Sequence, residues 1–144
     1  MNIPESVYRI LLTICSSKET EIGGILGGEN NIIKHLYFDV NRKSSISNYT
    51  PDTKLLNPII SDWQNQNIEF YGIFHSHPDI SEHLSSADEE YIREIMVSIP
   101  DEIEYLYFPL VLPKCGKIIV YKAIRQSRKV NIIRDDAEII GKEE

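Results

Sequence analysis

The segment YGIFHSHPDI, residues 71–80, contains two histidines separated by one residue, directly after an apolar run. In an extended backbone, side chains at positions i and i+2 lie on the same side, so the imidazoles of His75 and His77 can converge on one point. Imidazole nitrogen is a standard ligand of Zn²⁺ and other transition metals. The spacing therefore favours a metal site, although two hydrogen-bonded histidines at a strand end would give the same pattern.

A third candidate ligand lies in the segment SSAD, residues 85–88, which begins a stretch with helical spacing. Ser85 and Asp88 also have the spacing of a capping box, in which each side chain binds the backbone amide of the other. We expect the two roles of Asp88 to compete, because both use its carboxylate. With His75 and His77, Asp88 would supply three ligands and leave one position for water, the arrangement of a catalytic zinc.

A water held by such a metal needs a general base within hydrogen-bond reach. Glu21 is the candidate, because it lies in the otherwise apolar stretch EIGGILGG, where a carboxylate is costly unless it has a partner or a purpose. A solvated glutamate at a strand edge is the alternative that the sequence leaves open.

These residues together resemble the JAMM signature of the MPN-domain metalloproteases. The pattern is a glutamate upstream, then His-Ser-His-Pro, then Ser-x-x-Asp after the seven residues 78–84, and it is complete in this sequence. The resemblance covers roughly residues 5–125, with the glutamate on an early strand, the histidines at the end of a central strand, and Ser85 and Asp88 at the start of a helix.

The resemblance implies a role for each residue. Zn²⁺ would be held by His75, His77 and Asp88. Glu21 would accept a proton from the zinc-bound water and pass it to the leaving amine. Ser85 resembles the residue that hydrogen-bonds the oxyanion of the tetrahedral intermediate.

The third position of the signature, Ser76, is expected to support the loop rather than to react. Neither a base nor an orienting acid is placed to make it a serine-protease nucleophile.

Family members hydrolyse isopeptide or peptide bonds after the C-terminus of ubiquitin or ubiquitin-like proteins. The resemblance thus implies a zinc-dependent isopeptidase of the compact prokaryotic type, acting on a ubiquitin-like protein or its conjugate. Members of this type also process sulfur-carrier proteins, or occur beside E1- and E2-like enzymes in bacterial conjugation and defence systems. A non-catalytic MPN scaffold is a further alternative, but such relatives lose ligands that are all present here.

Composition sets the remaining limits. The chain has 144 residues, 42% hydrophobic and 26% charged, with a net charge of −7, so we expect one domain over residues 1–144 and no nucleic-acid partner. Two cysteines without CxxC spacing indicate a reducing compartment, and no signal peptide or membrane span is recognisable. We therefore expect a cytoplasmic protein without membrane contacts.

Hydrophobic periodicity predicts an α/β chain of the α+β type, with helices on a mixed, mainly antiparallel sheet. The resemblance implies a cytidine-deaminase-like MPN/JAB fold. Residues 42–58 are expected to form a long loop suited to partner contacts, and Gly27–Asn30 a hairpin turn. The predicted helices are 4–16, 57–67 and 85–100, and the predicted strands are 19–30, 31–40, 68–74, 105–113, 117–125 and 129–135.

Four further residues are not assigned to the site. We expect His83 to be a solvated loop residue and His35 a surface or core histidine. Cys15 is expected in a helix core and Cys115 in a turn, and together they lack the paired spacing of a zinc-binding cysteine set.

Overall fold

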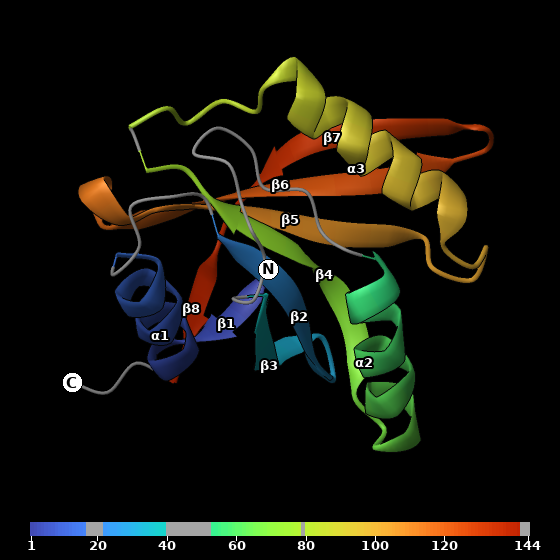
Figure 1. The fold of residues 1–144 in the computed structure, drawn as a ribbon, viewed down its shortest axis with the longest axis horizontal. Helices are drawn as coiled ribbons and strands as arrows, with labels where there is room; N and C mark the ends of the chain where they lie inside the picture. Colours follow the sequence, from blue (N-terminus) through green and yellow to red (C-terminus); the bar gives the residue numbers. More distant parts are fainter. Residues whose placement is uncertain (17–21, 40–52, 79, 142–144) are drawn as a thin grey trace.

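The structure is a computed structural model that describes residues 1–16, 22–39, 53–78 and 80–141 (Figure 1). Within these ranges the chain forms eight strands, three α-helices and one 3-10 helix. In chain order they are β1 (Asn2–Pro4), α1 (Glu5–Ser16), β2 (Gly23–Glu29), β3 (Ile32–Asp39), α2 (Thr53–Asn65), β4 (Glu69–Ser76), α3 (Ser86–Ser98), β5 (Tyr105–Leu112), η1 (Pro113–Cys115), β6 (Lys117–Gln126), β7 (Lys129–Asp135) and β8 (Glu138–Ile140).

The strands form one mixed sheet in the order β7-β6-β5-β4-β2-β3-β1-β8. Strand β2 pairs antiparallel with β3 and β4, and β6 pairs antiparallel with β5 and β7. Strands β4 and β5 are parallel, and so are the pairs that β1 makes with β3 and β8. The predicted α+β class with a mainly antiparallel sheet is confirmed, and β4 lies in the middle of the sheet.

Helices cover both faces of this sheet (Figure 1). On one face, Leu11 and Cys15 of α1 pack with Leu26 and Phe74. On the other face, the side chains of α2 and α3 pack against Ile25 and Ile73. These two residues directly precede Leu26 and Phe74 in the sequence. Adjacent residues of a strand thus enter opposite cores, which explains why β2 and β4 are apolar without alternation.

The hairpin between β2 and β3 turns later than predicted. Its turn is Asn30–Asn31, with φ values of 53° and 62°, because asparagine tolerates the left-handed conformation that a tight hairpin turn requires. Gly27 lies inside β2 instead, where an added Cβ would lie 2.5 Å from the Trp63 ring. That glycine serves close packing and not the turn.

The predicted loop over residues 42–58 is wrong at its C-terminal end, because α2 begins at Thr53 and contains Pro58. Residues 40–52 lie outside the described part of the chain, so the partner role expected for this segment stays a prediction. The two short strands at the sheet end, β1 and β8, were not predicted, since three-residue strands carry too little periodicity to be recognised.

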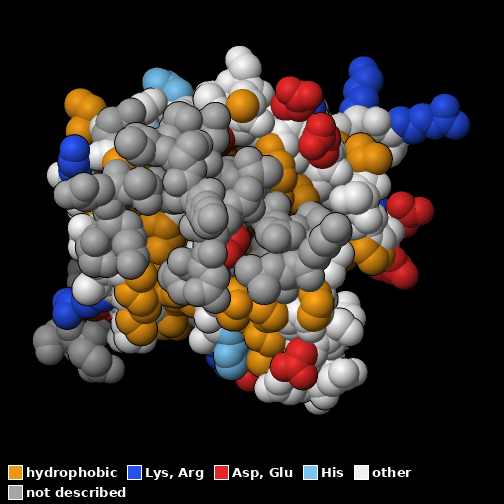
Figure 2. Space-filling view, viewed as in Figure 1, with side chains coloured by type: hydrophobic (Ala, Val, Ile, Leu, Met, Phe, Trp, Pro, Cys, Tyr) orange, Lys and Arg blue, Asp and Glu red, His pale blue; other side chains and the backbone are white. Residues whose placement is uncertain are grey.

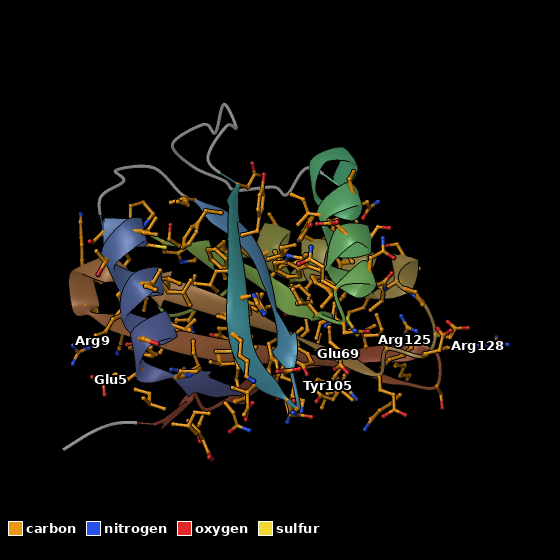
Figure 3. The ribbon with its side chains drawn as sticks, turned by 90° about the horizontal axis from the view of Figure 1, so that it is seen from below. Glu5, Arg9, Glu69, Tyr105, Arg125 and Arg128 are labelled. Carbon is orange, nitrogen blue, oxygen red and sulfur yellow. The ribbon has the colours of Figure 1, made fainter. Side chains whose placement is uncertain are left out.

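Helix α3 is fixed to the sheet at its C-terminal end by Arg125 of β6, which is labelled in Figure 3. Its guanidinium donates hydrogen bonds to the carbonyl oxygens of Met96, Ile99 and Pro100. A cation at a helix C-terminus also interacts favourably with the helix dipole. The buried residues of this helix are Ile92, Ile95 and Met96.

The opposite side of α3 is exposed, and Figure 2 shows acidic side chains along it. Glu89, Glu90 and Glu94 are exposed there, as expected for a solvated helix face.

Among the described residues, no helix combines the length and the apolar character that crossing a membrane would require.

Candidate metal centre

Both histidines lie at the C-terminal end of strand β4. His75 lies in β4, where it pairs with Gly23 of β2 and Leu110 of β5, and His77 follows directly after the strand. The amide of His77 donates to the carbonyl of Val111 at 3.0 Å, which continues the contact with β5. The two imidazole rings have centroids 5.0 Å apart, so the predicted convergence of positions i and i+2 is present.

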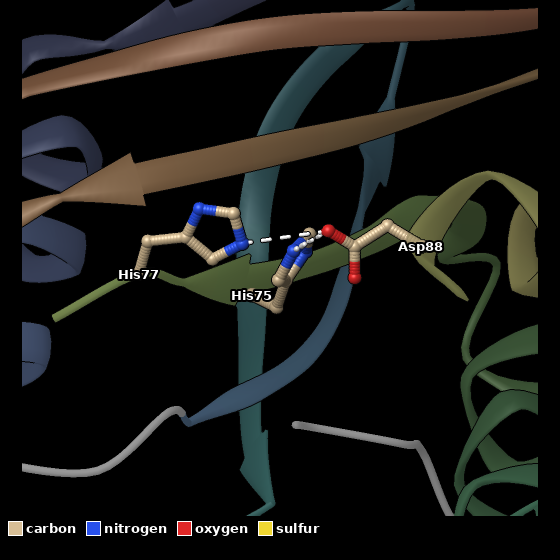
Figure 4. Close-up of side chains that lie close together, drawn as sticks. All are labelled: His75, His77 and Asp88. Atoms are coloured by element: carbon tan, nitrogen blue, oxygen red, sulfur yellow. Dashed lines mark ion pairs between the residues drawn. The ribbon is translucent and has the colours of Figure 1, made fainter. Parts of the chain in front are cut away.

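The third residue, Asp88, comes from the first turn of α3. Its Oδ2 lies 3.5 Å from Nε2 of His75 and 3.4 Å from Nε2 of His77 (Figure 4). One ligand atom from each of the three residues lies within 4.8 Å of the others, and no other such group occurs in the described ranges. The structure therefore brings together the three predicted ligands.

Asp88 caps the helix and faces the histidines at the same time, so the two positions are compatible, and the expected competition between capping and metal binding stays a prediction. Ser85 caps α3 with a complete capping box: its amide donates to Asp88 Oδ2 at 2.9 Å, and its Oγ accepts from the Asp88 amide at 3.0 Å. The same oxygen, Oδ2, faces both imidazoles. A carboxylate oxygen has two lone pairs, and here the cap and the site share them.

The electrostatics of Asp88 reflect this arrangement. Burial by itself raises the pKa of the carboxyl. The imidazoles of His75 and His77 and the hydrogen bond from the Ser85 amide act in the opposite direction and outweigh it. They hold the pKa of Asp88 well below its usual range, so the group is a carboxylate at neutral pH.

The contacts of the two histidines indicate which ring nitrogens face the Asp88 carboxylate. Nδ1 of His77 lies 3.2 Å from the carbonyl oxygen of Ser81, which only accepts, so the proton of a neutral ring belongs on Nδ1. Nε2 of the neutral ring carries a lone pair, and it stabilises the Asp88 carboxylate and lowers its pKa only when a second proton makes the ring a cation. The buried Nε2 of His75 has no hydrogen-bond partner, since its contact with Asp88 meets the distance of an ion pair without hydrogen-bond geometry.

Electron-rich atoms that face one another at these distances require a cation between them. A proton on a ring nitrogen would provide one, and a divalent metal would provide another. Two imidazole nitrogens and one carboxylate oxygen are a donor set that zinc accepts, and the Ser81 carbonyl is the kind of outer contact that fixes the tautomer of a metal-binding histidine. The residues present therefore fit a metal ion.

Ser76 ties this region to β2. It is 2% exposed, its Oγ accepts from the amide of Ile22 at 3.0 Å, and its own amide donates to the Ile22 carbonyl at 2.8 Å. This is the supporting role expected of Ser76. Glu21, the predicted base, precedes Ile22 in sequence but lies outside the described residues, so its role stays a prediction.

The remaining candidates are not part of the cluster. His83 is exposed, and His35 is an exposed residue of β3 whose ring lies 6.3 Å from that of Trp63. Cys15 is buried and Cys115 is exposed, and both are free thiols. Neither cysteine is part of the group of possible metal ligands found among the described residues.

Sequence reasoning missed the contacts that orient the cluster. The Ser81 carbonyl has no signal in the sequence, because any residue carries one. Glu82, whose side chain contacts Lys117 and Arg134, was missed, and its only signal in the sequence is an acidic residue between the histidines and the helix cap.

Comparison with known proteins identifies the family. A family profile described as prokaryotic homologs of the JAB domain matches residues 4–131. A curated relative, the desampylase of Pyrococcus furiosus, is 32% identical over 75 residues, which are 52% of this chain and 54% of that protein. The chain thus spans about half the length of the curated relative that it matches.

Two solved structures share the fold. The solution structure of protein DSY2949 from Desulfitobacterium hafniense matches with a TM-score of 0.72 and 16% identity, over 99% of this chain and 93% of that one. The crystal structure of AF2198, a JAB1/MPN domain protein from Archaeoglobus fulgidus, matches with a TM-score of 0.57 and 18% identity, over 97% and 99%. At these identities the likeness concerns the fold alone.

Proposed function

This chain belongs to the family of prokaryotic homologs of the JAB domain, and we propose that it is a zinc-dependent peptidase that cleaves after the C-terminus of a ubiquitin-like protein. The observation that carries the proposal is the convergence of His75, His77 and Asp88 within 4.8 Å, in a chain that keeps every position of the family's catalytic signature. The relative named desampylase supports a hydrolytic role. We further propose that residues 1–144 act as a single domain.

The ligands of the ion would be His75, His77 and Asp88. When bound, zinc would polarise the scissile carbonyl and make water acidic enough to attack near neutral pH. The protein's part is to hold the three ligand atoms together. The strand pairing of β4 holds His75, the Ser81 carbonyl orients His77, and the capping box fixes Asp88.

Ser85 has the chemistry to stabilise an oxyanion. Its Oγ accepts from the Asp88 amide, which uses a lone pair and leaves the hydroxyl proton available for donation. We propose that this proton is donated to the oxygen of the scissile carbonyl as negative charge develops on it. The cap fixes the backbone of Ser85 for this purpose.

We propose Glu21 as the general base and acid. It would accept a proton from the attacking water and deliver it to the leaving amine, a task for which a carboxylate beside an apolar segment is suited. Two hydrogen bonds tie its neighbour Ile22 to Ser76, between the two histidines in sequence. This link supports the assignment of Glu21 to the same centre.

The substrate class is tested by a cleavage assay with a panel of ubiquitin-like proteins fused at their C-termini or conjugated to lysine. Candidate substrates are the proteins encoded by genes next to the gene for this protein, including sulfur-carrier proteins and substrates of E1- and E2-like enzymes. We expect release of the mature C-terminus that stops on addition of a zinc chelator and resumes with added Zn²⁺. Glu21→Gln should abolish release and keep the metal.

The matched control is His83→Ala, which removes an exposed histidine outside the cluster. It should leave cleavage unchanged, whereas His77→Ala should abolish it. Zinc binding without cleavage of any panel member would favour a partner-binding MPN scaffold as the second candidate, and cleavage that persists in chelator would contradict the metal mechanism.

A further inference from the structure

The segment from Ser81 to Ser85 controls two of the three proposed ligands. At one end, the Ser81 carbonyl receives the hydrogen bond from Nδ1 of His77. At the other end, the Ser85 amide donates to Oδ2 of Asp88. A displacement of this segment would therefore move His77 and Asp88 together, while His75 is held separately by β4.

Glu82 connects this segment to the sheet. Its carboxylate accepts from Nζ of Lys117 at 2.7 Å and from Nη2 of Arg134 at 3.1 Å. Its backbone carbonyl accepts from the hydroxyl of Tyr121 at 2.6 Å. One residue thus has contacts to three side chains of β6 and β7, and it lies next to Ser81 in sequence.

The three partners are themselves held in place by the sheet. Tyr121 of β6 and Arg134 of β7 are directly opposite each other in the antiparallel pair, and the guanidinium of Arg134 lies 5.9 Å from the centre of the Tyr121 ring. Lys117 is four residues before Tyr121 on the same strand, so it lies on the same face. The anchor is therefore a regular sheet surface rather than another loop.

We infer that Glu82 is a positioning residue of the proposed metal centre: its contacts with Lys117, Arg134 and Tyr121 hold the segment that orients His77 and Asp88. The inference rests on the proposed function. Partly exposed ion pairs contribute little to global stability, so we expect loss of the two carboxylate contacts to act on the geometry of the site and to leave folding nearly unchanged.

The test compares Glu82→Ala with Glu29→Ala. Glu29 forms an exposed ion pair with Lys34 at 2.9 Å, and it lies at the far end of β2 from the Gly23–His75 pair. The readouts are the Zn²⁺ affinity of the metal-free protein, measured by competition with a chromophoric chelator, and the visible absorption spectrum of the Co²⁺-loaded protein.

We expect Glu82→Ala to bind Zn²⁺ about 10-fold more weakly than wild type, at the lower end of the effects of outer contacts on metal sites. Its Co²⁺ spectrum should change, and its melting temperature should match that of Glu29→Ala, which keeps wild-type affinity. Tyr121→Phe, which removes only the hydroxyl, should weaken binding in the same direction. Glu82→Gln, which keeps a carbonyl acceptor, should restore part of the affinity.

Equal Zn²⁺ affinity and identical Co²⁺ spectra in Glu82→Ala and Glu29→Ala would overturn the inference while leaving the metal centre intact. A wild-type protein that binds neither ion would overturn the proposed function and, with it, the inference. The two failures are therefore distinguishable in one experiment.

Discussion

Ser85 and Asp88 hold each other through two reciprocal hydrogen bonds, from the Ser85 amide to Oδ2 of Asp88 at 2.9 Å and from the Asp88 amide to Oγ of Ser85 at 3.0 Å. The oxygen that completes the cap is also the one that faces His75 and His77. The start of helix α3 is therefore part of the proposed metal centre. A substitution of Ser85 or Asp88 should affect the helix cap and the metal centre together.

Asp88→Ala should lower metal affinity and stability together, whereas Asp88→Asn should separate the two effects. Alanine removes the carboxylate that accepts from the Ser85 amide, and a typical hydrogen bond contributes about 1 kcal/mol. Asparagine keeps an acceptor oxygen for the Ser85 amide but loses the charge that a cation needs. Urea unfolding of the metal-free variants and Zn²⁺ titration would measure the two effects. Wild-type zinc affinity in Asp88→Asn would show that the carboxylate is not a ligand.

Ser85→Gly should lower turnover much more than it lowers stability. Glycine at the cap position costs only a few tenths of a kcal/mol, whereas loss of an oxyanion donor costs about 10²–10³ in kcat. Steady-state kinetics on the cleavable substrate, with zinc content measured in parallel, would test this. An unchanged kcat in a zinc-loaded Ser85→Gly enzyme would remove Ser85 from the mechanism.

The residues of the candidate site could be predicted from the sequence, but the tertiary contacts that position them could not. The three proposed ligands and the cap were recognised because their residue types and spacing reflect local chemistry, that is, alternation on a strand and the first turn of a helix. The sharing of one Asp88 oxygen was not foreseen, because it depends on how α3 lies across the sheet.

Fold details failed where tertiary contacts decide them. Gly27 and Gly28 have the composition of a turn, yet they lie in β2 because the Trp63 ring and the Ile32 backbone approach too closely for a side chain. The pairing of β1 with β3 and β8 was equally invisible, since contacts between distant segments determine it.

Gly72→Ala should destabilise the protein by about 1–3 kcal/mol or more, the usual cost of overpacking. An added Cβ at this position of β4 would lie 1.9 Å from the carbonyl oxygen of Tyr107 in β5, and a backbone atom cannot rotate away. The measurement is the free energy of unfolding in urea.

The control for this prediction is Gly116→Ala. Gly116 has φ +64° with nothing within 4 Å of an added Cβ, so only the backbone strain of a left-handed alanine, roughly 1 kcal/mol, should result. A Gly72→Ala variant no less stable than Gly116→Ala would contradict the close approach of β4 and β5.

The buried thiol of Cys15 should make the protein less stable at alkaline pH. Burial raises the pKa of Cys15 from 9.0 to about 12. Because the raised pKa favours the protonated thiol in the folded state, its contribution to stability is complete below about pH 9 and falls as pH rises toward 12. Unfolding free energies at pH 8 and pH 10 should therefore differ more in wild type than in Cys15→Ala. Equal differences in the two proteins would show that Cys15 ionises without unfolding.

If His75, His77 and Asp88 form a metal site, the purified chain binds zinc, and elemental mass spectrometry measures its zinc content directly. Wild type, reconstituted with Zn²⁺ and desalted, should retain one zinc per chain. Asp88→Ala and His77→Ala should retain none, while His83→Ala should retain one. A wild-type chain without zinc, or an Asp88→Ala chain with as much zinc as wild type, would show that these three residues do not form a metal site.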